Sequence, residues 1–278
     1  MTSPLPRLFT SISGRMGKLF DMNEKALPQN FRNRIKNGEV VFGVFCKTTA
    51  PEMIECLGYA GFDFCILDQE HGPVGMVTLQ NLIRAAELSG ICPIVRTGSI
   101  DEVGVSHPLD VGAAGVQVPQ VNSLDDAKRA IDLARFSPDG HRGVCRFVRA
   151  ARFADMDRAE YFKAANESLI ILQLEGSALE AYKDIVKLPQ VDVFFIGPYD
   201  ISQSLGMTGQ VDAPEVQAKI REIIAIAKAN GKVIGIFADT PEQVRRWVAA
   251  GCQYIAYSVD YGIFYSACKE LRSKIASI

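Results

Sequence analysis

Short apolar segments rich in β-branched and aromatic residues recur along the whole chain. Each is almost continuously apolar rather than alternating, which is typical of strands that are covered on both faces. Segments of helical periodicity lie between them, and several open with a proline or a capping serine. The predicted strands are 41–46, 64–68, 92–96, 114–118, 169–174, 192–197, 232–237 and 253–259, and the clearest helices are 51–60, 123–136, 176–188, 214–229 and 241–249.

Eight strands that alternate with helices predict an α/β protein of the (β/α)8 TIM barrel class. A doubly wound sheet is the alternative, but the absence of an obvious switch point favours a closed barrel. No linker or shift in composition divides the chain, so we expect a single barrel domain over 31–278 after an N-terminal extension over 1–30. The regular spacing is interrupted at 119–168 and 203–213, and long excursions on a barrel usually serve function.

Composition narrows the class of protein and of partner. The chain is 48% hydrophobic and 22% charged, with a net charge of −2. This balance gives no support for binding to nucleic acid or to an anionic membrane surface. The apolar runs are too short to span a membrane. Seven cysteines without a Cys-x-x-Cys pair indicate reduced thiols, and hence a cytoplasmic protein.

Polar side chains follow five consecutive predicted strands at the point where each strand ends. In (β/α)8 barrels the chemistry takes place at the carboxyl ends of the strands. We therefore expect these side chains to share one pocket. They are Asp68, Glu70 and His71 after the second strand, Arg96 after the third, Gln117 after the fourth, Gln173 and Glu175 after the fifth, and Gly197, Pro198, Tyr199 and Asp200 after the sixth.

The two acids on the fifth and sixth strands, Glu175 and Asp200, are candidate metal ligands. Two carboxylates with open positions suit Mg²⁺ or Mn²⁺, which retain water and accept a chelating substrate. The alternative is that both acids only cap the helices that follow them. Free backbone N–H groups near the Gly197-Pro198 step would lie beside them with little side-chain crowding.

The second and third strands carry candidates for catalysis. Arg96 could bind a carboxylate or stabilise an enolate, or it could form a salt bridge with Asp68 or Glu70. His71 could act as a general base oriented by one of those acids, or it could simply hold a turn. A basic run that includes Arg146 could bind an anionic substrate tail, or it could be a solvated face.

Four motifs, "LDQEHGP", "PIVR", "LQLEG" and "FIGPYDIS", in this order and at these spacings, resemble the HpcH/HpaI aldolase family. The resemblance covers about residues 30–275. It implies a barrel of the pyruvate/phosphoenolpyruvate-binding superfamily that acts as a class II pyruvate aldolase, a carbon–carbon lyase. By motif, Glu175 and Asp200 would bind the divalent metal, Arg96 would steady the enolate, and His71 with Asp68 would be the acid/base pair.

The resemblance also assigns supporting roles and an assembly. Gln173 would lie beside the metal, and the backbone of Gly197 and Pro198 would hold the carboxylate of a small keto acid. The family implies a homo-oligomer, built from dimers and often hexameric, in which the last helix packs on a neighbouring subunit.

Three residues depart from the family pattern. Lys47, Arg146 and Tyr199 would make the acceptor side of the substrate pocket more cationic and more crowded. In this respect the chain resembles a siderophore-type citrate synthase branch, that of the staphyloferrin B pathway. Such an enzyme would join oxaloacetate to acetyl-CoA without a metal. A non-catalytic keto-acid-binding barrel is a third possibility, but the presence of every motif acid and base disfavours it.

Overall fold

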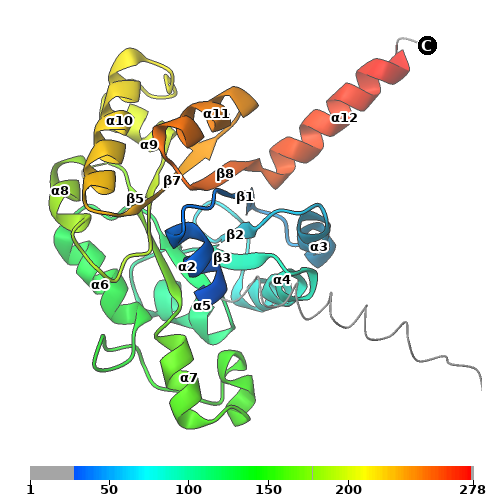
Figure 1. Ribbon diagram of the computed structural model, residues 1–278. Coiled ribbons are helices and arrows are strands. Elements are labelled where there is room, and N and C mark those ends of the chain that lie inside the picture. The colour runs from blue at the N-terminus through cyan, green and yellow to red at the C-terminus, as the bar shows by residue number, and fades with distance from the viewer. Residues whose placement is uncertain (1–27, 177, 277–278) are drawn as a thin grey trace, which may run out of the picture.

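The computed structural model describes residues 28–176 and 178–276 and shows a closed barrel of eight parallel strands (Figure 1). Each strand pairs with the next one in sequence, and β8 pairs with β1 to close the barrel. The predicted (β/α)8 class is confirmed. The strands are β1 Val41–Cys46, β2 Phe64–Asp68, β3 Cys92–Arg96, β4 Gly115–Val118, β5 Leu169–Leu174, β6 Val193–Ile196, β7 Val233–Ala238 and β8 Tyr254–Val259.

The helices between the strands cover the outer face of the barrel. Local sequence explains several of their ends. Ser123 and Thr240 cap the helices that follow them with side-chain oxygens, and Gly90 and Gly251 end the helices that precede them in left-handed conformations. The helices are α2 Pro28–Lys36, α3 Pro51–Tyr59, α4 Met76–Ser89, α5 His107–Asp110, α6 Leu124–Ala134, α7 Arg158–Ala165, α8 Ala178–Ile185, α9 Pro198–Ser204, α10 Pro214–Ala229, α11 Pro241–Ala250 and α12 Asp260–Ala276, with a π-helical turn Glu102–Ser106 and a 3₁₀ turn Arg149–Ala154.

Helix α2 closes the amino-terminal end of the barrel. The buried ring of Phe31 packs edge-on against Phe64 at 5.8 Å and Tyr254 at 6.2 Å between centroids. Aromatic edge-to-face packing of this kind adds to the free energy gained by burial. The domain boundary expected after residue 30 therefore falls inside this helix. Residues 1–27 of the predicted extension over 1–30 lie outside the described residues.

The alternation of side chains along each strand aims the polar residues into the barrel. On β2, Phe64 and Ile66 belong to the inner core, and Asp68 is the next inward position. Neighbouring strands follow the same pattern: every second side chain points into the barrel, and the last of these inward side chains lies at the strand end. The inward series end in Arg96 on β3, Gln117 on β4, Gln173 and then Glu175 on β5, and Gly197 after β6.

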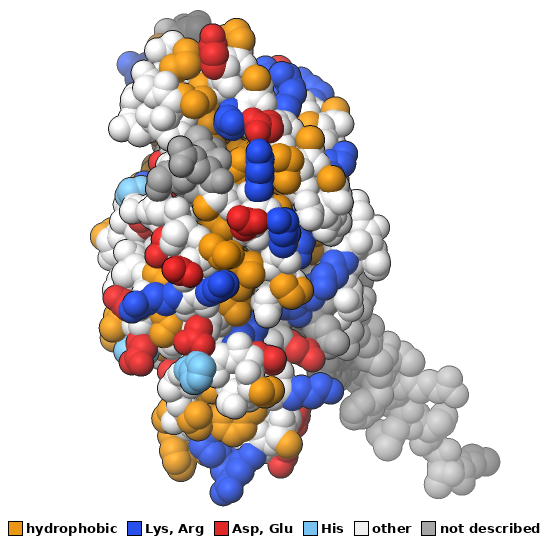
Figure 2. Space-filling view, turned by 90° about the vertical axis from the view of Figure 1, so that its left-hand side faces the viewer, with side chains coloured by type: hydrophobic (Ala, Val, Ile, Leu, Met, Phe, Trp, Pro, Cys, Tyr) orange, Lys and Arg blue, Asp and Glu red, His pale blue; other side chains and the backbone are white. Residues whose placement is uncertain are grey.

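Two parts of the chain extend beyond the barrel. The excursion around α7 has its own small core of Phe136, Ala151 and Tyr161. Helix α12 projects away from the barrel (Figure 1) and exposes large apolar residues along its length. On the face shown in Figure 2, acidic and basic side chains are interspersed rather than gathered in a field of one sign. No helix in the described ranges is long and apolar enough to cross a membrane.

Candidate active site

An ion pair between neighbouring strands forms the centre of the site. Asp68 on β2 is in register with Arg96 on β3. The guanidinium donates to both carboxylate oxygens, Nε to Oδ1 at 2.9 Å and Nη2 to Oδ2 at 2.7 Å. Burial by itself would raise the pKa of Asp68, but the hydrogen bonds and charge of Arg96 outweigh it and lower that pKa below its usual range. Asp68 is therefore a fixed anion that orients Arg96.

A second carboxylate, Glu70, extends this pair toward the rim of the barrel. Arg96 Nη1 lies 3.0 Å from Glu70 Oε2, and the side-chain amide of Gln120 donates to Glu70 Oε1 at 2.9 Å. His71 Nε2 lies 3.8 Å from Glu70 Oε2, and its side chain is 60% exposed. The contact between His71 and Asp68 is made by the backbone: the N–H of His71 donates to Asp68 Oδ1 at 3.2 Å. The ring of His71 is thus placed beside Glu70 rather than paired with Asp68.

Glu175 and Asp200 converge, as the sequence predicts for strand ends that are neighbours. A Cβ atom placed on Gly197 would lie 3.0 Å from Glu175 Oε2 and 2.7 Å from Asp200 Oδ2. Both oxygens therefore lie over the same glycine. Burial, and then the charge of Asp200, raise the pKa of Glu175 to about 7. Two carboxylates that repel each other in this way would be stabilised by a cation.

A chain of amides holds Glu175 from within the barrel. Gln117 donates to Gln173 at 2.6 Å, and Gln173 donates to Glu175 Oε2 at 2.9 Å. The backbone N–H of Gln120 donates to Glu175 Oε1 at 2.8 Å, from a left-handed backbone with φ of 52°. A non-glycine residue in that region is strained, and such strain concentrates at functional sites. Gln120 thus contacts both acids that flank the pocket, Glu70 and Glu175.

A pocket of about 130 Å³ opens above these groups. The pocket brings together most of the predicted site residues with an aromatic wall. The ring of Phe45 lies 4.7 Å from the guanidinium carbon of Arg96, within the range of a cation–π contact. The lining residues are Phe45, Lys47, Arg96, Gln173, Phe195, Gly197, Pro198, Tyr199, Asp200, Phe237 and Val259.

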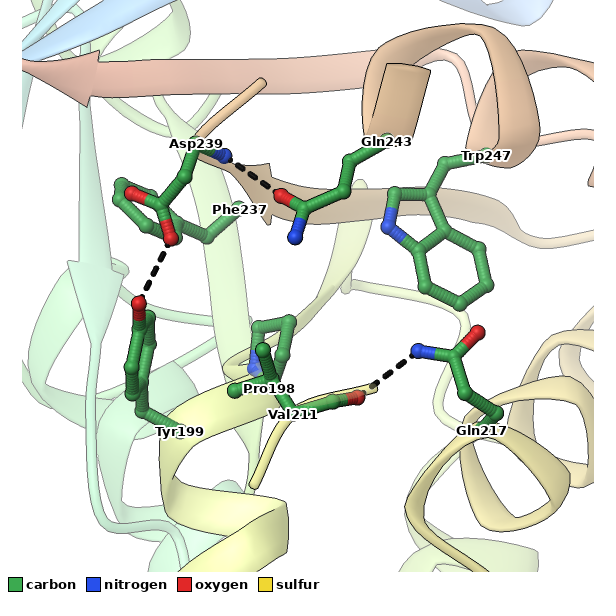
Figure 3. A pocket seen from close by; sticks show the side chains of 8 residues that line it. All are labelled: Pro198, Tyr199, Val211, Gln217, Phe237, Asp239, Gln243 and Trp247. Carbon is green, nitrogen blue, oxygen red and sulfur yellow. Dashed lines mark hydrogen bonds between the residues drawn. The ribbon is translucent and has the colours of Figure 1, made fainter. Parts of the chain in front are cut away.

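A smaller hollow lies on the other side of Tyr199 (Figure 3). Tyr199, Pro198 and Phe237 line both spaces and so form the wall between them. The hydroxyl of Tyr199 donates to Asp239 Oδ2 at 2.7 Å, which fixes the ring in the wall. This bond, together with burial, raises the pKa of Tyr199 to about 12. The face of Trp247 forms part of the far side of the hollow (Figure 3).

One sequence prediction is not met by this geometry. Arg146 does not line the pocket, because its guanidinium donates to the carbonyls of Ala154 and Met156 in its own excursion. Arg146 lies in the excursion between β4 and β5, where no strand end directs its side chain toward the pocket. The sequence analysis does not single out Gln120. The one sequence feature that points to it is its polar side chain directly after Pro119, just beyond the end of β4.

The carboxylates fit a hard divalent ion. Glu175 and Asp200 offer two oxygen ligands over Gly197, where no side chain competes for the space. Mg²⁺ is commonly held by one or two carboxylates together with water and substrate oxygens. No group of three or more His, Cys, Asp or Glu side chains able to hold a metal occurs within residues 28–176 and 178–276. A metal bound here would therefore depend on substrate and water for its remaining ligands.

Comparison with known proteins gives a consistent result. The family model for HpcH/HpaI aldolase/citrate lyase matches residues 41–267. A 5-keto-4-deoxy-D-glucarate aldolase from Salmonella arizonae is 32% identical over 252 residues, which is 90% of this chain and 98% of that protein.

Solved structures agree with the family. An HpcH/HpaI aldolase/citrate lyase family protein from Burkholderia cenocepacia is 30% identical with a TM-score of 0.84, over 88% of this chain and 98% of the other. The citrate synthase SbnG is also 30% identical, with a TM-score of 0.78 over 88% and 96% of the two chains. The barrel, the converging strand-end residues and these matches together show that the chain is an enzyme of the HpcH/HpaI aldolase/citrate lyase family, with an aldolase/lyase or citrate synthase type of reaction.

Proposed function

We propose that the enzyme forms the enolate of a small 2-keto acid, pyruvate or oxaloacetate, and makes or cleaves a carbon–carbon bond of a 2-keto-4-hydroxy acid with a divalent metal. The observation that carries this proposal is the convergence of Glu175 and Asp200 over Gly197. Gly197 and Asp200 line the same pocket as Arg96. A keto acid bound between Arg96 and a metal held by the two acids would have a cation on each side. This arrangement favours charge that develops on the keto oxygen in the transition state.

The side chains of the protein can be assigned to steps of this reaction. Contacts to Asp68 and Glu70 use three of the five N–H donors of Arg96, which leaves two to hydrogen-bond the enolate oxygen. Backbone N–H groups near Gly197 would hold the substrate carboxylate. His71, oriented by Glu70, would move the proton of the 4-hydroxyl group.

Mg²⁺ or Mn²⁺ held by Glu175 and Asp200 would act as a Lewis acid on the keto group. The protein would contribute the position and the charge of the two acids. Gln120 and Gln173 fix the orientation of Glu175 through hydrogen bonds to its two oxygens.

Exchange of the methyl protons of pyruvate with D₂O tests the proposal directly. Because enolate formation precedes any reaction with an acceptor, we expect exchange in the presence of Mg²⁺ or Mn²⁺ and a loss of at least about a hundredfold after thorough chelation. Proton NMR of pyruvate in D₂O measures it. Exchange that chelation leaves unchanged would reject the metal-dependent mechanism.

Tyr199 should limit the length of the second reactant. Replacing it with alanine would join the pocket to the hollow behind it. In the aldol addition of pyruvate to an aldehyde, the ratio of kcat/KM for hexanal to kcat/KM for acetaldehyde is therefore expected to rise about tenfold. Tyr199→Phe should leave this ratio unchanged, because the ring still fills the wall. Tyr59→Ala, on the exposed end of α3, is the control. A ratio that is the same for Tyr199→Ala and the native enzyme would contradict this role.

A second function is favoured by Lys47, which lines the pocket with its ammonium 3.9 Å from Asp68 Oδ2. A cation at this position suits oxaloacetate, whose second carboxylate needs a partner, with acetyl-CoA as the other substrate. This would be a citrate synthase reaction, and the similar SbnG structure is that of a citrate synthase. Release of free CoA from acetyl-CoA and oxaloacetate in EDTA would support it, and a rate no higher than background would reject it.

The assembly is part of the proposal. Helix α12 exposes a set of large apolar residues that a neighbouring subunit of a homo-oligomer would cover. A dimer or a hexamer built from dimers would place this helix on an adjacent barrel. The exposed residues are Tyr261, Phe264, Tyr265, Leu271 and Ile275.

A further inference from the structure

Lys47 is held by helix α12, which lies at the other end of the sequence. Its backbone N–H donates to Asp260 Oδ2 at 3.0 Å, and its backbone carbonyl accepts from the hydroxyl of Tyr261 at 3.0 Å. The N–H of Thr48 donates to the same Asp260 oxygen at 2.8 Å. The first two residues of α12 thus bind both backbone polar groups of Lys47.

The carboxylate of Asp260 is built into this contact rather than solvated. Asp260 is 3% exposed, and its other oxygen accepts from the backbone N–H of Tyr261 at 2.7 Å. Charge-assisted hydrogen bonds from backbone N–H groups to a buried carboxylate are strong, and losing them would leave several donors unpaired.

The backbone that leads into α12 is itself strained. Ser258 has a left-handed φ of 58°, and the pairing of β1 with β8 shifts register between Gly43 and Phe45. A left-handed non-glycine residue persists only where surrounding contacts fix it. Asp260 and Tyr261, which contact Lys47, come two and three residues after Ser258.

The ammonium of Lys47 is available to a ligand. Its closest carboxylate, Asp68, lies 3.9 Å away and is already bound by two hydrogen bonds from Arg96. The side chain of Lys47 is 28% exposed and lines the pocket. A cation that is not needed to neutralise its neighbour can pair with a carboxylate on the second reactant.

We propose that Asp260 is a positioning residue that fixes Lys47 for a second reactant bearing a carboxylate, so that α12 sets the acceptor preference of the pocket. This inference rests on the proposed lyase function for its kinetic consequence but not for the contact itself. Because α12 projects from the barrel (Figure 1), the contact of Asp260 with Lys47 is the physical link between that helix and the pocket.

Amide hydrogen exchange tests the contact without reference to activity. Asp260→Asn is expected to speed exchange of the backbone N–H groups of Lys47 and Thr48 about tenfold or more, because each loses a bond to a charged acceptor. Tyr261→Phe is a second, milder variant in case Asp260→Asn does not fold. It removes one hydroxyl on the surface and should give a smaller increase in the exchange rate. Glu270→Gln on the same helix removes only the ion pair with Lys274 and should change nothing. Unchanged exchange in both Asp260→Asn and Tyr261→Phe would overturn the proposal.

Kinetics with two acceptors tests the consequence. For aldol addition of pyruvate, Asp260→Asn and Lys47→Met are each expected to lower kcat/KM for glyoxylate ten- to a hundredfold, and for acetaldehyde less than threefold. The double variant should match Lys47→Met, because both changes remove one interaction. Equal losses for both acceptors, or losses that add in the double variant, would show a general structural defect and reject the positioning role.

Pyruvate proton exchange in D₂O separates this inference from the proposed function. It should continue in Asp260→Asn within about threefold, because Asp260 binds the backbone of Lys47 and Thr48 and is not one of the residues that line the pocket. If the native enzyme exchanges no pyruvate protons, the lyase proposal fails, while the amide exchange of Lys47 and Thr48 still decides whether Asp260 holds the loop.

Discussion

Replacing Arg96 with lysine is expected to lower kcat/KM for the lyase reaction and for pyruvate proton exchange by about a thousandfold. Arg96 binds both oxygens of Asp68, contacts Glu70 and lies over the ring of Phe45, all with one planar group. A lysine ammonium keeps the charge but cannot reproduce this geometry and also point two donors at an enolate oxygen. Steady-state kinetics and NMR exchange in D₂O measure the two rates.

Lysine is the informative replacement because it keeps a cation beside the buried Asp68. Methionine at position 96 would remove the cation that makes two hydrogen bonds to that buried carboxylate, at a cost of about 3–5 kcal/mol in stability. The loss of stability would then be hard to separate from a loss of catalysis. Arg84→Lys is the matched control, because Arg84 lies on the exposed face of α4, where its guanidinium donates to the side chain of Asn81. Activity of Arg96→Lys within tenfold of the native rate would contradict the assigned role.

Replacing Glu175 with glutamine or Asp200 with asparagine should abolish Mn²⁺ binding and lower the exchange rate about a thousandfold. The native site should also show a pH dependence of defined sign. The pKa of Glu175 is raised to about 7, so the carboxyl holds a proton below that pH, and the metal must displace it. Mn²⁺ affinity is therefore expected to fall about tenfold per pH unit below 7 and to level off above it.

Calorimetric titration of Mn²⁺ at pH 6 and pH 8, in buffers of different ionisation enthalpy, measures the affinity and the protons released. Proton release should approach one at pH 6 and be small at pH 8. The same shift acts on folding: the folded protein binds this proton more tightly than the unfolded chain, whose ordinary value is 4.5. Without metal, stability should therefore decrease as pH rises from about 4.5 through about 7. Affinity that does not change between pH 6 and pH 8 would contradict this assignment of Glu175.

The positions of the strands and of most pocket residues could be predicted from sequence. All eight strands lie within one residue of the expected ranges, because unbroken apolar runs bounded by glycine, proline and charged residues are local signals. Arg96, Gln173 and Asp200 could be placed at the pocket because each lies at the carboxyl end of a strand or a few residues beyond it. Arg146 has no such signal, because it lies in the long excursion, where no strand end fixes its direction.

The pairing of His71 shows a second limit. The family resemblance makes His71 and Asp68 an acid/base pair, and the two residues are three positions apart in the sequence. The turn after β2 instead presents its backbone N–H to Asp68 and carries its ring toward Glu70. Distance along the chain does not determine which atoms of two residues meet in a turn.

Local patterns in the sequence suffice to predict the barrel, the order of its strands and the rim where we expect the chemistry, because strand periodicity and strand ends are properties of neighbouring residues. Contacts between distant segments are visible only in the folded chain: Gln120 adopts a left-handed backbone to reach two acids, Tyr199 divides two hollows, and Asp260 holds Lys47. The physical reason is closure: pairing β8 with β1 brings together residues 213 positions apart, and no local pattern encodes such a contact.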